Sequence, residues 1–316
     1  MHDEFAKIEW LKTRFELDGD SRKVVVGIGD DAAVIDFGHR PTIVTVDTQV
    51  EGVHFRRDLI SCRALGYRAV IAAVSDVWAM AAMPSASVTA LTLPADFSDE
   101  QFRELIEGIA EGACETGAQV IGGNLSQGPS LSVTTTVFGL PAAKSVTREG
   151  GGLGDSIYVT GTLGSAALGL GVLEAAAIDL DQAAAFIERW RRPPTHGHVA
   201  QALAVLATAA VDVSDGCLQD LQHLCTASGV GATLHADAIP TAPGYQATCE
   251  ALGLDPLLLA LTGGEDYELL FTAPESPEAD ALGTKIGEIT EGSIVRVVDK
   301  DGEAIEIGRT GFRHFS

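Results

Sequence analysis

The sequence predicts an α/β (α+β) protein of two domains with mixed sheets, and three observations lead to this prediction. The chain has 316 residues, enough for two domains of ordinary size, and 46% of them are hydrophobic. Segments with strand-like and helix-like patterns alternate along both halves. A glycine-rich stretch at 141–155 separates the halves. We therefore expect an N-terminal domain over residues 1–140 and a C-terminal domain over residues 150–316.

The first half alternates between the two kinds of segment. The apolar run 63–83 predicts a buried helix that ends at Pro84. A second helix is expected to begin at Ser98, where Gln101 completes a capping box, and to end near Gly117. Strands are expected at 23–28, 42–46, 87–93, 118–121 and 131–140. The last of them alternates and is rich in β-branched residues, which is typical of a half-buried antiparallel strand.

The second half continues the alternation without a solenoid-type repeat or a low-complexity tract. Helices are expected at 165–176, at 182–191 and from Leu218 onward. Strands are expected at 157–160 and 209–213, and near 267–272, 285–289 and 294–298. Strands and helices mixed in this way favour two α/β domains whose sheets are not wholly parallel.

The charge of the chain limits its partners. There are 21 Lys and Arg against 44 Asp and Glu, a net charge of −23. Such a field repels nucleic acid and anionic membranes, so we expect neither as a partner. It also repels the phosphates of ATP. Phosphate chemistry in this chain therefore requires cations.

The cysteines and the apolar segments favour a cytoplasmic location. The five cysteines are widely spaced and form no C-x-x-C pair, which is typical of buried thiols in a reducing compartment. The first residues lack the apolar core of a signal peptide. The longest apolar stretch, 69–83, contains Asp76 and is shorter than the roughly 20 residues that cross a bilayer.

Acidic clusters are the candidate chemistry. Residues 27–32 read G-x-G-x-x-A after a strand, like a dinucleotide-binding turn. However, Asp30 and Asp31 stand where a pyrophosphate would lie, and like charges about 4 Å apart repel by about 4 kcal/mol at an effective dielectric of 20. A phosphate could approach this turn only with metal between. The alternative, a dinucleotide site, is disfavoured.

Three further clusters follow the same pattern, and each also has an ordinary structural explanation. Asp47 ends a strand seven residues before His54, which suits either a polar turn or a metal ligand with a substrate contact. Asp76 lies in an apolar helix, so a core partner or a cation must compensate its charge, and we favour the cation. Asp212 and Asp215 flank a strand-to-helix turn, where Asp215 or the Ser214 between them could also cap the helix.

The last cluster is Gly263-Gly264-Glu265-Asp266, at the start of a strand, and it could equally be a charged surface turn. The sequence contains no Walker A motif, no protein-kinase motif set and no nucleophile elbow. Phosphoryl transfer would therefore need another architecture, in which carboxylates bind Mg²⁺ together with substrate phosphates.

Taken together, these segments resemble the thiamine-monophosphate kinase family. GIGDDAAV, DTQVEGVHF, AVSDVWAMAAMP, IGGN, DVSDG and LTGGEDYELLFT stand in the order and spacing typical of that family, and GFRHF is similar to its C-terminal motif. The similarity runs from about residue 4 to 315. It implies the aminoimidazole-ribonucleotide-synthetase-like fold, with an N-terminal sheet domain that dimerises, a larger C-terminal α/β domain, and ATP between them.

The resemblance also implies site residues. Metal ligands would be Asp30, Asp31, Thr45, Val46, Asp47, Asp76, Asn124, Asp212 and Asp215. ATP would be bound by Gly123, Asn124, Arg148 and Ser214. Thiamine monophosphate would be bound by His54, Glu265 and Phe312.

The chain departs from the family at three of its positions. Asn124 stands where the family commonly has Asp, so one metal site has less negative charge. Phe312 replaces a terminal Trp or Tyr and keeps only the stacking surface. Gln49 replaces an aliphatic residue, with no functional meaning that the sequence reveals.

The resemblance implies ATP-dependent phosphorylation of thiamine monophosphate to the diphosphate, by direct in-line transfer assisted by several Mg²⁺ ions. The attacking phosphate oxygen is already ionised at neutral pH, so we expect no general base. Two alternatives stay open. One is another ATP-dependent synthetase of the superfamily. The other is an ATP- or metal-binding regulator that Asn124 has weakened as a catalyst.

Overall fold

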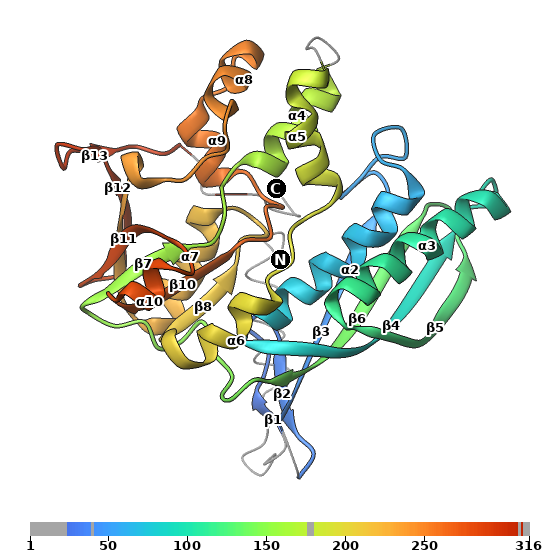
Figure 1. Cartoon of the computed structure of the whole chain (residues 1–316), viewed down its shortest axis with the longest axis horizontal. Helices are drawn as coiled ribbons and strands as arrows, with labels where there is room; N and C mark the ends of the chain where they lie inside the picture. The colour runs from blue at the N-terminus through green and yellow to red at the C-terminus, as the bar shows by residue number, and fades with distance from the viewer. Residues whose placement is uncertain (1–23, 39–40, 176–179, 309–310, 312–316) are drawn as a thin grey trace, which may run out of the picture.

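Two mixed sheets, one in each half of the sequence, form the framework of the protein (Figure 1). The computed structural model describes residues 24–38, 41–175, 180–308 and 311, with side chains omitted at 180–182. Each sheet contains several antiparallel strand pairs and one parallel pair, which confirms the expected mixed type.

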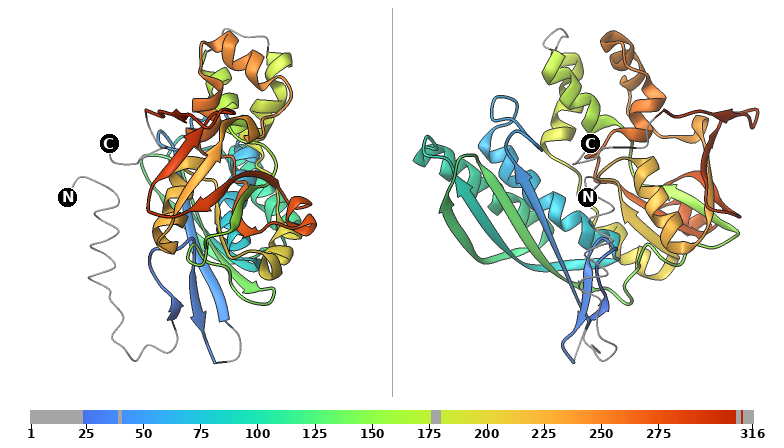
Figure 2. Two further views of the ribbon diagram at one scale, coloured as in Figure 1. Left: turned by 90° about the vertical axis from the view of Figure 1, so that its left-hand side faces the viewer. Right: turned by 180° about the vertical axis from the view of Figure 1, so that it is seen from behind.

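The first sheet has six strands in the order β1-β2-β3-β6-β4-β5. The strands are β1 (Val24–Val26), β2 (Ala33–Asp36), β3 (Pro41–Val50), β4 (Ala82–Leu93), β5 (Gln119–Gln127) and β6 (Ser132–Pro141). Helices α2 (Cys62–Ala79) and α3 (Asp99–Thr116) lie side by side over one face (Figures 1 and 2). Strand β6 alternates between buried and half-buried positions along most of its length, as its sequence predicts.

The second sheet has seven strands in the order β13-β12-β9-β11-β7-β10-β8. They are β7 (Asp155–Val159), β8 (Ala209–Asp212), β9 (Gly231–His235), β10 (Leu269–Pro274), β11 (Thr284–Thr290), β12 (Val295–Val298) and β13 (Ala304–Ile305). The helices of this half are α4 (Ser165–Ala175), α5 (Leu180–Arg191), α6 (Gly197–Leu206), α7 (Cys217–Ser228), α8 (Tyr245–Leu252), α9 (Pro256–Thr262) and α10 (Pro277–Asp280), with a 3₁₀ turn, η1 (Ala236–Ala238).

Helix α2 is central because it is buried almost all round. It packs on β3 and β6, on α3, and on β8 and β10 of the second half. The apolar core around it includes residues from both halves, such as Val74, Tyr158 and Phe271. Through these contacts α2 brings its C-terminal turns against the end of β8, where the candidate site lies.

Some predicted boundaries are wrong. The strand expected at 42–46 continues to Val50, so Asp47 lies inside β3 and not at its end. Pro84 does not end the first long helix; α2 ends at Ala79, and Pro84 lies inside β4. The proline is tolerated because pairing with β5 begins only at Ala86, so at Pro84 the strand is bonded on the β6 side alone, next to a register shift. The next helix matches its prediction, with a capping box between Ser98 and Gln101 and a left-handed Gly117 at its end.

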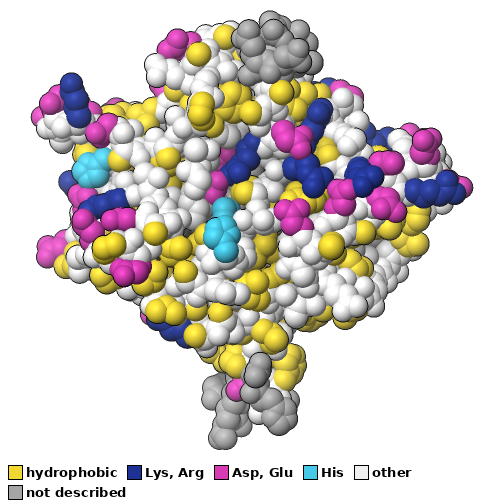
Figure 3. Space-filling view, in the orientation of Figure 1, with side chains coloured by type: hydrophobic (Ala, Val, Ile, Leu, Met, Phe, Trp, Pro, Cys, Tyr) yellow, Lys and Arg dark blue, Asp and Glu magenta, His cyan; other side chains and the backbone are white. Residues whose placement is uncertain are grey.

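Charged side chains of both signs lie over α2 and α3 (Figure 3). Glu111 on α3 pairs with Arg63 on α2 and, at 3.0 Å, with Arg192 just after α5. Arg191 donates to the carbonyl of Leu59 at 2.8 Å. These contacts tie the two halves together at the surface. Among the described residues, no helix is both long and apolar enough to cross a membrane.

Close packing of α2 on α3 depends on glycine. A Cβ added at Gly108 would overlap the carbonyl of Arg63, and one at Gly66 would overlap the carbonyl of Leu105. We expect Gly108→Ala to lower the free energy of unfolding by about 3 kcal/mol, because the helices must move apart. Urea unfolding measures this loss. Gly152→Ala, where a Cβ meets no atom within 4 Å, should change stability by less than about 1 kcal/mol. Equal losses in the two variants would contradict the prediction.

Candidate functional site

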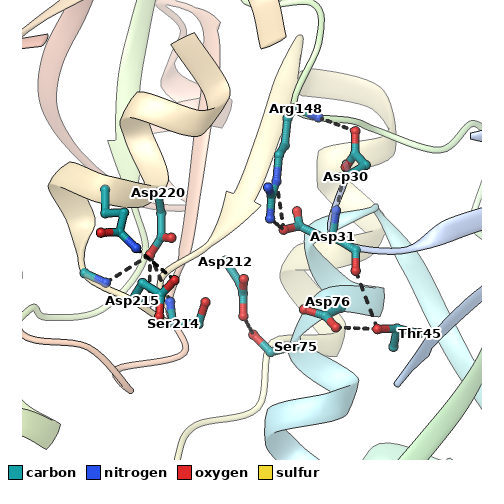
Figure 4. Close-up of polar contacts among 12 residues, drawn as sticks. Asp30, Asp31, Thr45, Ser75, Asp76, Arg148, Asp212, Ser214, Asp215 and Asp220 are labelled. Carbon is teal, nitrogen blue, oxygen red and sulfur yellow. Dashed lines mark hydrogen bonds and ion pairs between the residues drawn. The ribbon is translucent and has the colours of Figure 1, made fainter. Parts of the chain in front are cut away.

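Three carboxyl groups from distant parts of the sequence meet between the two halves (Figure 4). Asp31 lies just before β2, Asp76 lies on α2, and Asp212 ends β8. One oxygen of each lies within 4.8 Å of the others. If all three were ionised, each pair would repel by at least about 3 kcal/mol at an effective dielectric of 20. We call these three residues the carboxyl cluster.

Neighbouring groups hold the carboxyl cluster in place. The Thr45 hydroxyl donates to Asp76 Oδ2 at 2.5 Å, and the Ser75 hydroxyl donates to Asp212 Oδ2 at 2.7 Å. The Arg148 guanidinium donates to Asp31 Oδ1, with Nε at 3.1 Å. The other oxygen of Asp31 is buried and has no hydrogen-bond partner among the residues that the structure describes. An unpaired oxygen among converging carboxylates fits a hard divalent cation such as Mg²⁺.

Without a cation the carboxyl cluster holds protons tightly. Burial raises the pKa of Asp31 to about 6, although the Arg148 charge lowers it. Burial, and then the charge of Asp31, raise the pKa of Asp212 to about 7. Burial, and then the charge of Asp212, raise the pKa of Asp76 well above its ordinary value. Binding a divalent cation would reverse these shifts by favouring the ionised forms.

Other predicted metal ligands surround the cluster. Asp30 accepts the backbone N–H of Arg148 at 3.1 Å. Asp47 accepts the N–H of Thr48, and its charge contributes to the raised pKa of Asp76. Asp215 acts in the same way on the pKa of Asp212. The turn at 27–32 leads into β2 and not into a helix, so it is not a dinucleotide-binding turn.

Val46, Gly123 and Asn124 lie elsewhere. The Val46 side chain is 61% exposed, on the face of the first sheet opposite α2. Asn124 and Gly123, on β5, line a shallow pocket with Val88, Ala90, Thr134 and Thr136. In the sheet order β5 is three strands from β3, a separation of about 14 Å. A Cβ at Gly123 would also overlap the Thr89 carbonyl, so this glycine has a packing role.

A second polar group surrounds Glu265. One oxygen of this carboxylate pairs with the fully buried Arg68, and the other accepts from Trp190 Nε1 at 3.0 Å. The Arg68 guanidinium also lies over the rings of Trp190 and Tyr267. The charge of Arg68 is therefore paired with that of Glu265. Arg63 pairs with Glu111, so these two arginines of α2 pair with other carboxylates and not with Asp76.

Glu265 is tied to the turn that carries Ser214. Its backbone N–H donates to the Ser214 carbonyl at 2.8 Å, and its φ of 71° is unusual for a residue other than glycine. His54 lies in the loop after β3, where its Nδ1 accepts the N–H of Val50 at 3.0 Å. Phe312 lies outside the described residues.

The sequence did not reveal the residues that support this site: Arg68, Ser75, Trp190 and Asp220. Ser75 precedes Asp76 in an apolar helix, and its position next to a buried carboxyl was the one available signal. Asp220 accepts three backbone N–H groups of the turn at 214–216. The contacts of the other two join the halves of the chain, which no local pattern encodes.

The raised pKa values predict how stability depends on pH. Asp212 holds its proton more tightly in the folded chain than in the unfolded chain. The stabilisation that results from this raised pKa is complete below about pH 4 and is lost as pH rises to about 7. Without magnesium, we expect Asp212→Asn to be more stable than the parent at pH 8, by on the order of 2 kcal/mol, and by less at pH 5. Urea unfolding in EDTA measures both differences. A variant that is less stable at pH 8 would contradict this assignment.

Comparison with known proteins places most of the chain in one family. The descriptions "AIR synthase related protein, N-terminal domain" and "AIR synthase related protein, C-terminal domain" match residues 29–140 and 152–306. The thiamine-monophosphate kinase of Aquifex aeolicus is 34% identical over 99% of this chain and 98% of its own length. That of Escherichia coli K12 is 36% identical over 93% of each.

A solved structure extends this similarity to three dimensions. The structure described as AaThiL complexed with AMPPCP and TMP has a TM-score of 0.88 and 32% identity, and the match covers 99% of this chain and 97% of that one. A match over this share of the chain spans both sheets. The chain therefore belongs to the thiamine-monophosphate kinase family, within the AIR synthase related proteins.

Proposed function

We propose that this protein transfers the γ-phosphate of ATP to thiamine monophosphate and forms thiamine diphosphate. The relatives that carry this name match nearly the whole chain, and the related solved structure contains AMPPCP and TMP. The observation that carries the proposal is the carboxyl cluster: three carboxyls, of the buried Asp212 and the half-buried Asp31 and Asp76, converge at the junction of the halves. One oxygen of Asp31 has no hydrogen-bond partner within the described part of the chain. Such a group can bind the cations that accompany phosphates.

We infer that Asp31, Asp76 and Asp212 hold Mg²⁺, with Asp30, Asp47 and Asp215 close by. Bound there, Mg²⁺ would offset phosphate charge and stabilise the transferring phosphoryl group. Thr45 and Ser75 fix the orientation of two of the carboxyls. No general base is needed, because the acceptor phosphate is already ionised.

Arg148 is the positive side chain of this site. Its backbone N–H is held by Asp30, and its guanidinium lies on Asp31, with 21% of the side chain exposed. A planar guanidinium can form two parallel hydrogen bonds to phosphate oxygens. We propose that Arg148 and Ser214 contact ATP from the second half of the chain.

The acceptor is bound at Glu265 in this proposal. Arg68 and Trp190 fix both oxygens of its carboxylate, so Glu265 is ordered before any ligand arrives. Its side chain keeps 24% of its surface exposed, while Arg68 beneath it has none. A rigid, partly exposed carboxylate suits a cationic heteroaromatic group such as that of thiamine, because it supplies the opposite charge. His54 would contribute from the loop after β3.

We further propose that two copies of the chain pair through the face of the first sheet opposite α2. On this face Val46 is 61% exposed. The edge strand β5 is exposed along its whole length, including Ile121 at 62% and Leu125 at 63%. An apolar edge of this kind favours association with another copy, as the family resemblance implies.

The five free cysteines fit a reducing cytoplasm.

The reaction is tested by incubating the purified chain with ATP, Mg²⁺ and thiamine monophosphate and measuring thiamine diphosphate. We expect product from the parent and a loss of at least about 10³-fold in kcat/KM for Asp76→Asn, because one cluster charge is removed. Asp96→Asn, at an exposed surface position, should retain parental activity. Folded parent protein that forms no product would contradict the proposal.

The same assay separates the two alternatives. Another synthetase of the superfamily would turn over ATP with a different acceptor and leave thiamine monophosphate unchanged. A weakened regulator would bind AMPPCP with Mg²⁺ and show no turnover, and Asn124→Asp would restore activity.

Pairing is tested by light scattering of the full chain. We expect the mass of a dimer for the parent and of a monomer for Ile121→Asp, because a carboxylate would be buried without a partner in the interface. Ile294→Asp, at a position 60% exposed in the second half, should remain dimeric. A parent that is monomeric at micromolar concentration would contradict this arrangement.

A further inference from the structure

The turn between β8 and α7 is held by a carboxylate from inside the helix. Three consecutive backbone N–H groups, of Ser214, Asp215 and Gly216, donate to Asp220 Oδ2 at 3.0, 3.1 and 3.1 Å. Asp220 is only 3% exposed, and Figure 4 shows its carboxylate against this turn. Ser214 and Asp215, which could also have capped α7, do not do so: the N-cap is Gly216, without a side-chain capping bond.

This arrangement decides what the turn can bind. Free N–H groups at the start of a helix commonly bind phosphate. Here the three amides of the turn just before α7 are already bonded to Asp220, so the turn contributes its side chains and carbonyls to the site and not these amides. The chain thus places an internal anion where other turns bind an external one.

The turn is also fixed from its other sides. Gln219 Nε2 donates to Asp215 Oδ2 at 3.0 Å. Gly216 has a φ of 123°, and a Cβ there would lie 2.9 Å from the Thr262 carbonyl. The Ser214 carbonyl accepts the N–H of Glu265 at 2.8 Å. The shape set by Asp220 therefore reaches Asp215 on the metal side and Glu265 on the acceptor side.

We propose that Asp220 is a positioning residue for Mg²⁺ and nucleotide. It contacts neither directly; it fixes the turn so that Asp215 and Ser214 face the carboxyl cluster. This inference rests on the proposed function for the identity of the ligands. Loss of the carboxylate would release three N–H groups, one of them buried and two half-buried, and let the turn rearrange, weakening the site without removing any ligand.

The test compares Asp220→Ala and Asp220→Asn with Asp155→Ala in the full chain. Asp155 is a matched control, because it is 8% exposed and its Oδ2 likewise accepts a loop N–H, from Gly152 at 3.0 Å, and the Thr208 hydroxyl at 2.7 Å. Thermal unfolding is followed while Mg²⁺ is titrated at fixed AMPPCP. The Mg²⁺ concentration for half-maximal activity is measured in parallel.

We expect Asp220→Ala to need 10- to 100-fold more Mg²⁺ in both measurements, with kcat largely recovered at saturating Mg²⁺. Asp220→Asn keeps an acceptor oxygen without the charge and should fall between it and the parent. Asp155→Ala should unfold at a lower temperature with the parental Mg²⁺ midpoint. If Asp220→Ala does not fold, Asp220→Asn decides the question through the same midpoint.

A parental midpoint in both Asp220 variants, or an equal shift in Asp155→Ala, would overturn the inference. The proposed function fails separately, if the parent forms no thiamine diphosphate. In that case a shifted midpoint in the thermal measurement would still support a positioning role toward Mg²⁺ and AMPPCP.

Discussion

The repulsion among Asp31, Asp76 and Asp212 is the constraint on which the rest of the structure depends. Three carboxyls within 4.8 Å of one another, in a chain of net charge −23, are unfavourable unless they are protonated or bound to cations. The fold accepts this cost between its two sheets, with one arginine, Arg148, as partial compensation. A site that is strained in this way when empty gains most from a divalent cation, and this links stability to ligand binding.

Helix α2 is the element that makes the convergence possible. It is buried against the first sheet, against α3 and against the second half, so its position has little freedom. Asp76 and Ser75 are neighbours on it, and they face carboxyl groups from both halves. Arg68, two turns earlier, pairs with Glu265. One rigid helix thus sets the distance between the carboxyl cluster and Glu265.

Local chemistry made part of this fold and site predictable. The capping box at Ser98 and Gln101 and the alternation of β6 involve neighbours in sequence, and both were confirmed. The acidic segments could be grouped because each was expected at the end of a strand or within an apolar helix, although Asp47 lies inside β3. The site residues carried over from the family still await the experiments above, although the structure does bring several of them together.

Other features depend on distant contacts and were missed. Pro84 was expected to stop a helix but lies in a strand, where it is tolerated because the strand is bonded on one side only at this residue. Helix α6 and strand β9 carry weak local signals and are held by packing against the rest of the chain. Gln49 had no evident role in the sequence. It is 2% exposed, with its amide near both Asp47 and Arg68, at 3.5 and 3.4 Å.

Asn124 shows how position changes the meaning of a substitution. From the sequence, a missing carboxylate at this residue suggested a weaker metal site. In the structure Asn124 lies on β5, in the pocket opposite α2, and the strands β4 and β6 separate it from β3. Within one chain its neutral side chain therefore leaves the charge of the carboxyl cluster unchanged. An effect on metal binding would have to act across the exposed face of the first sheet, where the proposed second copy would lie.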